Sequence, residues 1–348
     1  MDLFSQIFLG WPVPIWLGFL AIVLVLLALD LGIFHRKAHA PGVRESLMMS
    51  AFYVTLALSF SAAIYYLYYQ SAPPGGFDKA LAIEDNAERA ARAAQLYLTG
   101  YIVEWSLSLD NIFVMSLIFG YFAVPREHQH RVLFWGILGV IILRASLIFV
   151  GAALVAQFHW VLYLFAAFLL WTGVMMLKKG GEDDPHIADN KAIKFLRRHM
   201  PVTDKMHGGK FWIREPDSAT GKMKLFATPL FLALIVIEFA DLVFALDSVP
   251  AIFAITTDPF IVYTSNIFAI LGLRTLYFSL AALIHRFAYL KYALAATLIF
   301  IGAKIFVGEF LPGGKVPPEI SLVVIIGLLS SGIFYSLWKT RKQRSAPQ

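Results

Sequence analysis

Long apolar segments make up most of this sequence, and each is about 20 residues long, the length that an α-helix needs to cross the hydrocarbon core of a bilayer. Of the 348 residues, 59% are hydrophobic and only 15% are charged. In a soluble domain about a quarter of the residues are charged. The chain is therefore expected to be an all-α polytopic membrane protein that contacts a lipid bilayer.

Hydrophobic periodicity and length predict about nine transmembrane helices. We expect them near residues 14–34, 47–69, 96–122, 132–155, 160–177, 228–255, 260–285, 290–307 and 320–338. Residues 85–95 are expected to form a separate short amphipathic helix on the surface. The hydrophilic segment 178–224 is expected to hold a small helix and a turn or short hairpin.

Lysine and arginine gather in alternate connections between these helices, whereas opposite connections such as 156–159 and 256–259 contain almost none. Because basic loops stay in the cytoplasm, we expect the N-terminus outside and the C-terminus inside, in the inner (plasma) membrane. The chain then divides into 1–95 with two helices and an extracytoplasmic connection, 96–178 with a first three-helix repeat, 179–226 as a cytoplasmic loop, 227–308 with a second three-helix repeat, and 309–348 with the final helix and a basic tail.

The net charge of +6 is assigned to this topology and to anionic lipid, so we expect no nucleic-acid partner. The sequence contains no cysteine. Disulfides, thiolate metal sites and cysteine nucleophiles are therefore excluded.

Two acidic stretches, EWSLSLDNIFV and DLVFALDSVPA, lie inside apolar segments. Their aligned polar residues are Glu104, Asp110 and Asn111 in the first stretch and Asp241, Asp247 and Ser248 in the second, with Glu238 one turn before Asp241. A charged acid at the centre of a bilayer costs about 2.5–3.5 kcal/mol on insertion scales. A chain that carries several such acids is expected to use them in a functional site.

Each acidic stretch is followed by an arginine in the next helix and by a glycine in the helix after that. The arginines are Arg144 and Arg274, and the glycines are Gly173 and Gly302. A unit of three helices turns the following unit over, so the pattern predicts a 3+3 inverted-topology repeat. Such repeats build secondary transporters, with the site near the midplane where the repeats meet.

The acidic side chains do not all fall on one helix face. At about 100° per residue, Glu104 and Asn111 share a stripe, whereas Asp110 lies about 120° away, and Asp247 has the same relation to the second stripe. Either the helices are locally unwound, as in the broken helices of transporters, or these two aspartates face sideways and pair with the arginines. Pro250 favours some irregularity because it lacks an N–H.

The acids carry more charge than the two arginines could neutralise, and carboxylate and carbonyl oxygens suit Mg²⁺, Ca²⁺ or Mn²⁺. The predicted metal site consists of Glu104, Asp110, Asn111, Glu238, Asp241, Asp247 and Ser248. A structural or charge-pairing role is predicted for Arg144, Arg274 and Lys304. The blander alternative is that the acids and arginines form buried ion pairs that only stabilise the fold.

Four motifs resemble the TerC/Alx family of integral membrane proteins. They are EWSLSLDNIFV, LGVIILRA, FADLVFALDSVPAIFAIT and SNIFAILGLRTLYF. The resemblance implies manganese export and, in some members, the supply of metal to extracytoplasmic enzymes, and the family takes its name from tellurite resistance. It also implies an acidic site at Glu104, Asp110, Glu238, Asp241 and Asp247, with Asn111 and Ser248 beside them.

We therefore expect a secondary transporter, not an enzyme, that exports a divalent metal, Mn²⁺ before others, from the cytoplasm. Protons are the expected coupling ion, because a carboxylate releases metal when it is protonated. The alternative is a non-transporting membrane protein that binds metal, supplies it to extracytoplasmic enzymes, or scaffolds a response to tellurite or alkaline pH. The oligomeric state does not follow from these patterns.

Overall fold

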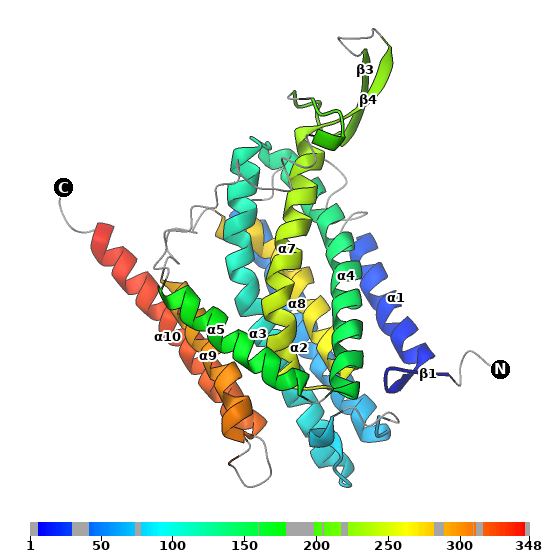
Figure 1. The fold of residues 1–348 in the computed structure, drawn as a ribbon, viewed down its shortest axis with the longest axis vertical. Coiled ribbons are helices and arrows are strands. Elements are labelled where there is room, and N and C mark those ends of the chain that lie inside the picture. The colour runs from blue at the N-terminus through cyan, green and yellow to red at the C-terminus, as the bar shows by residue number, and fades with distance from the viewer. Residues whose placement is uncertain are drawn as a thin grey trace.

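The computed structural model describes residues 6–29, 42–73, 78–158, 160–178, 198–203, 205–216, 222–281, 289–308, 310 and 316–344. The side chains of Lys79, Asp110, Arg274 and residues 341–344 lie outside this description. The described part is a bundle of long helices with two small hairpins (Figure 1).

Each predicted transmembrane helix corresponds to one helix of the bundle. These helices are α1 (Val13–Leu29), α2 (Val43–Gln70), α3 (Asn86–Tyr121), α4 (Arg126–Gln157), α5 (Val161–Lys178), α7 (Pro229–Phe253), α8 (Pro259–Leu280), α9 (Leu290–Gly308) and α10 (Pro318–Arg344). Seven of them are long and apolar enough to span a membrane, and two shorter apolar stretches, Val13–Leu29 and Pro259–Leu273, belong to α1 and α8. The expected all-α polytopic architecture is confirmed.

Helix α3 differs from the sequence prediction because it includes the segment that was expected to form a separate surface helix. It runs without a break from Asn86 to Tyr121. Asp85 caps its first turn, where a carboxylate oxygen accepts the backbone N–H of Glu88 at 2.7 Å. The sequence that follows, AERAARAA, consists of strong helix formers, so nothing separates the surface turns from the membrane-spanning part.

Helix α7 is also regular where the sequence favoured an irregularity. It is helical from Pro229 to Phe253, and Pro250 lies in its last turn. There the missing N–H removes a single bond near the end of the helix, which is cheaper than a break in the middle. Because α3 is likewise unbroken, neither helix has the unwound segment that the first alternative required.

The centre of the bundle is formed by α3, α4, α7 and α8. Helix α3 packs on α8 and α4 packs on α7, while α3 also contacts α7 and α4 contacts α8. Helix α2 covers α3 and α8, and α1 reaches the same core through Phe19, whose ring packs on Tyr263 of α8. On the other side α5, α9 and α10 form a slanted layer (Figure 1).

Helices α5 and α9 cross closely through two glycines. A Cβ at Gly173 would lie 2.9 Å from the carbonyl oxygen of Ala295, and a Cβ at Gly302 would lie 2.8 Å from that of Ala166. These are the glycines that the sequence matched between the two units. Exchanging α3, α4 and α5 for α7, α8 and α9 turns the α3–α8 pair into the α4–α7 pair and leaves the α3–α7, α4–α8 and α5–α9 pairs as they are, although the inverted repeat itself stays a prediction.

The hydrophilic segment contains the short hairpin that was predicted for it. Strand β3 (Trp212–Pro216) pairs antiparallel with β4 (Met223–Ala227), and Trp212 lies opposite Ala227. The hairpin projects beyond the helix ends (Figure 1). The small helix predicted before it falls mostly outside the described residues. A second hairpin, β1 (Ile7–Phe8) with β2 (Trp11–Pro12), precedes α1.

The opposite end of the bundle carries a buried polar network. Asp78, just before the 3₁₀-helix η3 (Lys79–Leu81), accepts the hydroxyl of Thr256 at 2.7 Å and the backbone N–H of Thr257 at 3.0 Å. Asp258 caps α8 by accepting the N–H groups of Phe260 and Ile261 at 3.0 and 3.1 Å. The network therefore ties the segment after α2 to the α7–α8 connection.

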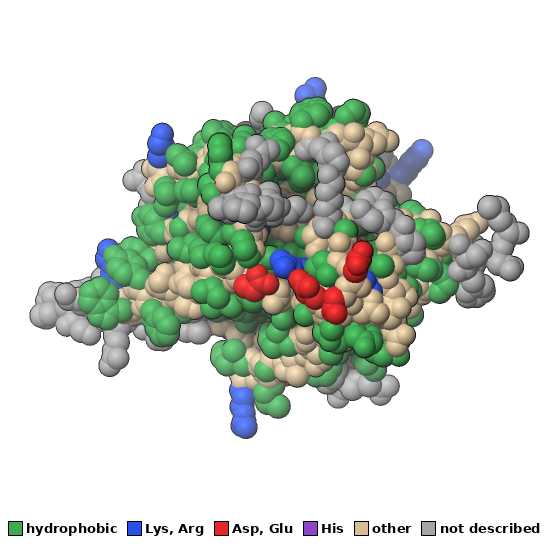
Figure 2. Space-filling view, turned by 90° about the horizontal axis from the view of Figure 1, so that it is seen from below, with side chains coloured by type: hydrophobic (Ala, Val, Ile, Leu, Met, Phe, Trp, Pro, Cys, Tyr) green, Lys and Arg blue, Asp and Glu red, His purple; other side chains and the backbone are tan. Residues whose placement is uncertain are grey.

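Exposed carboxylates stand at this same end. They are Glu84, Asp85 and Glu88 near the start of α3, and Glu319 at the start of α10. Figure 2 shows acidic side chains near the centre of this face. The two ends of the bundle thus differ in charge, because the end with the β3–β4 hairpin carries basic residues such as Arg126, Arg131 and Lys210.

Candidate functional site

Arg144 of α4 is the centre of a buried cluster between the four central helices. Its side chain is 1% exposed. A guanidinium does not lose its charge inside a protein, so burial requires acceptors around it. Arg144 forms an ion pair with Glu104 of α3, and its Nε and Nη2 lie 3.4 Å from the two carboxylate oxygens of Asp241 on α7.

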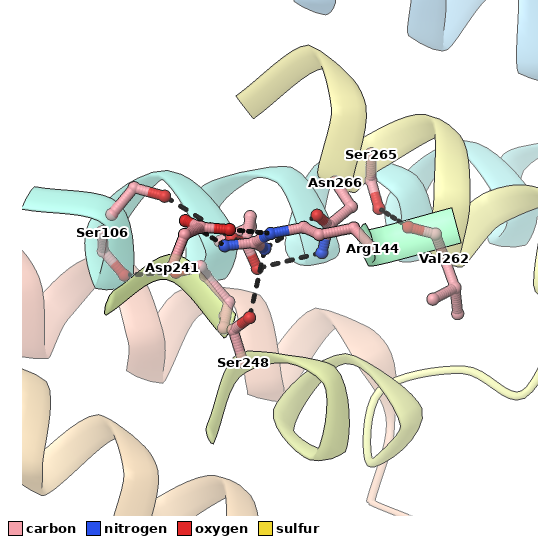
Figure 3. A network of polar contacts seen from close by, with 10 residues as sticks. Ser106, Arg144, Asp241, Ser248, Val262, Ser265 and Asn266 are labelled. Atoms are coloured by element: carbon pink, nitrogen blue, oxygen red, sulfur yellow. Dashed lines mark hydrogen bonds and ion pairs between the residues drawn. The ribbon is translucent and has the colours of Figure 1, made fainter. Parts of the chain in front are cut away.

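Neutral side chains complete the shell around the guanidinium (Figure 3). Arg144 Nη1 also donates to Asn266 Oδ1 of α8 at 2.8 Å and to Ser248 Oγ of α7 at 3.2 Å. Asn266 donates its own Nδ2 to the second oxygen of Glu104 at 3.0 Å. The hydroxyl of Ser108 lies 3.5 Å from Glu104 Oε1. Four helices thus meet at one cluster that is almost closed to solvent.

Helical spacing explains why these residues meet. Glu104 and Ser108 are one turn apart on α3, and Asp241 and Ser248 are two turns apart on α7, so each pair lies on one helix face. Glu104 and Asp241, which the alignment of the two acidic stretches placed over one another, do contact the same group. The shared group is a protein cation, Arg144.

The other predicted site residues are less central. Asn111 is buried two turns further along α3, at 3% exposure, and Asp247 is half-buried on α7. The side chains of Asp110 and Arg274 lie outside the described residues, so their predicted roles and pairing remain predictions. The second alternative had Asp247 pair with one of the two arginines; in the described contacts Glu104 and Asp241 are the acids that meet Arg144, and a pairing with Arg274 stays a prediction.

Glu238 lies one turn before Asp241 on α7 and faces α4. Its carboxylate fills the space beside Gly139, where an added Cβ would lie 2.6 Å from Glu238 Oε2. That oxygen is buried and has no hydrogen-bond partner among the described residues. Glu238 therefore lies next to the cluster, in the space that Gly139 leaves open, and its Oε2 makes no hydrogen bond to the described members of the cluster.

Lys304 lies on α9, away from the central cluster, and its Nζ is 3.5 Å from Ser321 Oγ of α10. This contact fits the structural role predicted for it. Asn266 was not predicted, although it is the residue that joins Glu104 to Arg144. The only signal was an amide in the apolar run SNIFAILGLR, two turns before Arg274.

In the part of the chain that the structure describes, the cluster has more acidic than basic groups. Two carboxyl side chains, Glu104 and Asp241, share one guanidinium. Among the side chains that the structure describes, no three His, Asp or Glu come close enough to hold a metal ion. In this conformation the ion-pair alternative therefore describes Glu104 and Asp241, and the surplus carboxylate is the feature that it leaves unexplained.

The chain resembles known membrane proteins over most of its length. Residues 90–344 match the family described as integral membrane protein TerC family. The chain is 45% identical to an uncharacterized membrane protein of Myxococcus xanthus over 94% of this chain and 93% of that protein. It is 43% identical to Alx of Escherichia coli strain K12, provisionally named a membrane-bound redox modulator, over 94% and 95% of the two chains. No solved structure matches it.

Proposed function

The chain belongs to the TerC family of integral membrane proteins, as its motifs predicted, and on that premise we propose that it is a secondary exporter of a divalent metal ion. Mn²⁺ is the substrate that we favour. The oxygens of Glu104, Asp241, Ser248 and Asn266 are the hard ligands that Mg²⁺, Ca²⁺ and Mn²⁺ prefer. Among these ions, the resemblance to the family favours manganese.

The observation that carries the proposal is the surplus carboxylate at the centre of the bundle. Glu104 and Asp241 are both almost fully buried, at 1% and 3% exposure, and among the described side chains they share a single arginine. If the pair served only to balance Arg144, one acid would be enough. Since each acid at membrane depth costs about 2.5–3.5 kcal/mol, the second one indicates a function.

The helix arrangement supports the same proposal. Inverted repeats place the substrate site where two helices of opposite direction meet, and α3 and α7 supply the two carboxylates. In the proposed orientation the basic end with the β3–β4 hairpin faces the cytoplasm and the acidic end faces outward, in the inner membrane. Protons that enter from outside would displace the metal from the carboxylates, which gives antiport.

A second candidate function is a membrane protein that binds metal without moving it and passes it to extracytoplasmic enzymes or scaffolds a stress response. The name of the Alx relatives points to a redox role for those proteins. In this chain such a role would not use thiols, because the sequence contains no cysteine. The buried central position of the two carboxylates favours transport over presentation at a surface.

Flux measurements test the proposal directly. The purified protein in liposomes that contain a Mn²⁺-sensitive dye should carry Mn²⁺ down its gradient and faster with an opposing proton gradient. Asp241→Asn should lower the initial rate by about tenfold or more, a loss of about 1.4 kcal/mol of barrier stabilisation. Glu319→Gln, which removes an exposed acid at the start of α10, is the matched control and should leave the rate unchanged.

Two results would contradict the proposal. Protein that binds Mn²⁺ but moves none in either gradient would favour the metal-presenting alternative. Equal rates for wild type and Asp241→Asn would show that the central carboxylates are not the site.

A further inference from the structure

The oxygens that a divalent cation would need already face a cation. Five oxygen atoms surround the Arg144 guanidinium: Glu104 Oε1, Asp241 Oδ1, Asp241 Oδ2, Ser248 Oγ and Asn266 Oδ1. Mg²⁺ takes about six oxygen ligands, and Ca²⁺ takes six to eight. A metal ion that bound all five of these oxygens would compete with the guanidinium for them, and the two positive charges would repel each other at this distance.

We propose that Arg144 is a tethered cation that holds the metal's place when the metal is absent and moves aside when the metal binds. The inference rests on the proposed transport function and assigns Arg144 a positioning role in it. Competition from Arg144 weakens metal binding. It also speeds release, because the returning guanidinium displaces the metal from Glu104 and Asp241.

A displaced arginine needs a second counter-ion, since it keeps its charge wherever it moves. Glu238 is placed for that purpose. It is one turn from Asp241 on α7, and its carboxylate lies against Gly139, five residues before Arg144 on α4. Long side chains on a helix lean toward its N-terminus, which is the direction from Arg144 to Gly139. The buried Oε2 of Glu238 is an unused acceptor.

Gly139 leaves the space that the Glu238 carboxylate occupies, because it has no side chain. A Cβ at this position would lie 2.6 Å from Oε2, so any other residue would push the carboxylate away from α4. Glu238 then serves the arginine, whereas the sequence prediction made it a metal ligand. In the empty state the guanidinium is shared by Glu104 and Asp241, and in the loaded state the metal takes these two acids and the guanidinium pairs with Glu238.

A double-mutant cycle on Mn²⁺ affinity distinguishes the two roles of Glu238. Binding is measured by titration calorimetry on the full chain in lipid nanodiscs, with wild type, Arg144→Gln, Glu238→Gln and the double variant. Arg144→Gln should bind Mn²⁺ about tenfold more tightly because the competitor is gone. Glu238→Gln should bind about tenfold more weakly in the wild-type background. In the Arg144→Gln background Glu238→Gln should change nothing.

Three results overturn the inference. One is folded Arg144→Gln protein that binds Mn²⁺ no better than wild type. Another is an equal loss from Glu238→Gln in both backgrounds, which would make Glu238 a metal ligand. The third is wild-type protein that binds no Mn²⁺, which contradicts the proposed function as well and is therefore distinguishable from the first two.

A second pair of variants tests whether the place of Glu238 beside α4 matters for binding if Arg144→Gln fails to fold. Gly139→Ala leaves every member of the central cluster in place and displaces the flexible end of Glu238. It should weaken Mn²⁺ binding by about as much as Glu238→Gln does. Gly136→Ala lies one turn away on α4, where its Cβ would make only ordinary contacts of 3.7 Å or more, and it is the matched control. Equal affinities for both alanine variants would overturn the inference.

Discussion

At the scale of single residues, the central question is which charges in the cluster serve the fold and which serve function. A buried ion that loses its partner destabilises a protein by about 3–5 kcal/mol. Arg144 is the only cation that the described contacts give to Glu104 and Asp241. The two acids are therefore not equivalent to the arginine in their effect on stability.

Arg144→Gln should lower the free energy of unfolding by about 3–5 kcal/mol, because it leaves two buried carboxylates without a counter-ion. Asp241→Asn should cost only about 1 kcal/mol, because Glu104 still pairs with the arginine one to one and the amide oxygen keeps one of the two contacts that Asp241 makes with the guanidinium. Thermal unfolding in one detergent at one pH measures both. An Asp241→Asn variant as unstable as Arg144→Gln would make the second acid structural and remove the argument from surplus charge.

The sequence predicted which acidic residues belong to this cluster better than it predicted which side chains contact one another. Glu104 and Asp241 were found because a charged residue inside an apolar segment can be recognised from the sequence alone. Asn266 was missed and the acids that pair with Arg144 were left open, because a contact between helices depends on rotation about each helix axis. Periodicity fixes that rotation relative to other residues of the same helix and not relative to a neighbouring helix.

At the scale of elements, the long apolar segments predicted each long helix of the described bundle, and the helix ends were the weak point. Hydropathy detects where lipid begins, whereas a helix continues for as long as its backbone has no reason to stop. Helix α3 therefore starts at Asn86, ten residues before the predicted start of the span, and Asp85 supplies the cap. Pro250 was given too much weight as a sign of irregularity, because it lies in the last turn of a helix that ends at Phe253.

The α5–α9 crossing gives a prediction at this scale. Gly302→Ala should destabilise the protein by about 1–3 kcal/mol, because the new methyl group meets the backbone of Ala166 at 2.8 Å and the helices must separate. Gly327→Ala on α10 is the control. Nothing lies within 4 Å of its Cβ, so it should stabilise by about 0.5–1 kcal/mol through helix propensity. Thermal unfolding of both variants measures these changes in stability. Changes of the same sign would refute the close crossing of α5 and α9.

At the scale of the whole molecule, the two ends of the bundle are built differently. The end that we propose to face outward is tied together by buried side chains, since Trp11 before α1 donates to the hydroxyl of Tyr68 at 3.2 Å and Tyr68 hydrogen-bonds Asp258. The other end carries the β3–β4 hairpin and basic side chains. The outward end therefore contains a buried carboxyl group, Asp258, through which stability should respond to pH.

Asp258 is the group that we expect to give this response. Burial, with a smaller contribution from Asp78, raises its pKa to about 6, although the N–H groups of the first α8 turn and the Tyr68 hydroxyl act in the opposite direction. Because the folded state binds the proton more tightly than the unfolded chain, its contribution to stability is full below about pH 4 and is lost as the pH rises through about 6. The difference amounts to about 3 kcal/mol.

Asp258→Asn should flatten the pH dependence of the unfolding temperature between pH 4 and pH 7, because an asparagine still caps the helix and does not titrate. Asp85→Asn is the matched control, since Asp85 caps α3 in the same way but is exposed. It should leave the profile unchanged. An Asp258→Asn profile parallel to that of wild type would show that this carboxyl does not titrate in the range.

The unbroken course of α3 has a practical consequence. With 36 residues at about 1.5 Å each it is roughly 54 Å long, whereas the hydrocarbon layer is about 30 Å thick. One stiff rod therefore carries Glu104 in the lipid and Ala87 in the surrounding water. The sequence contains no cysteine, so a single cysteine introduced at Ala87 could carry a spectroscopic label. Such a label would report, from outside the membrane, a tilt of α3 that also moves Glu104.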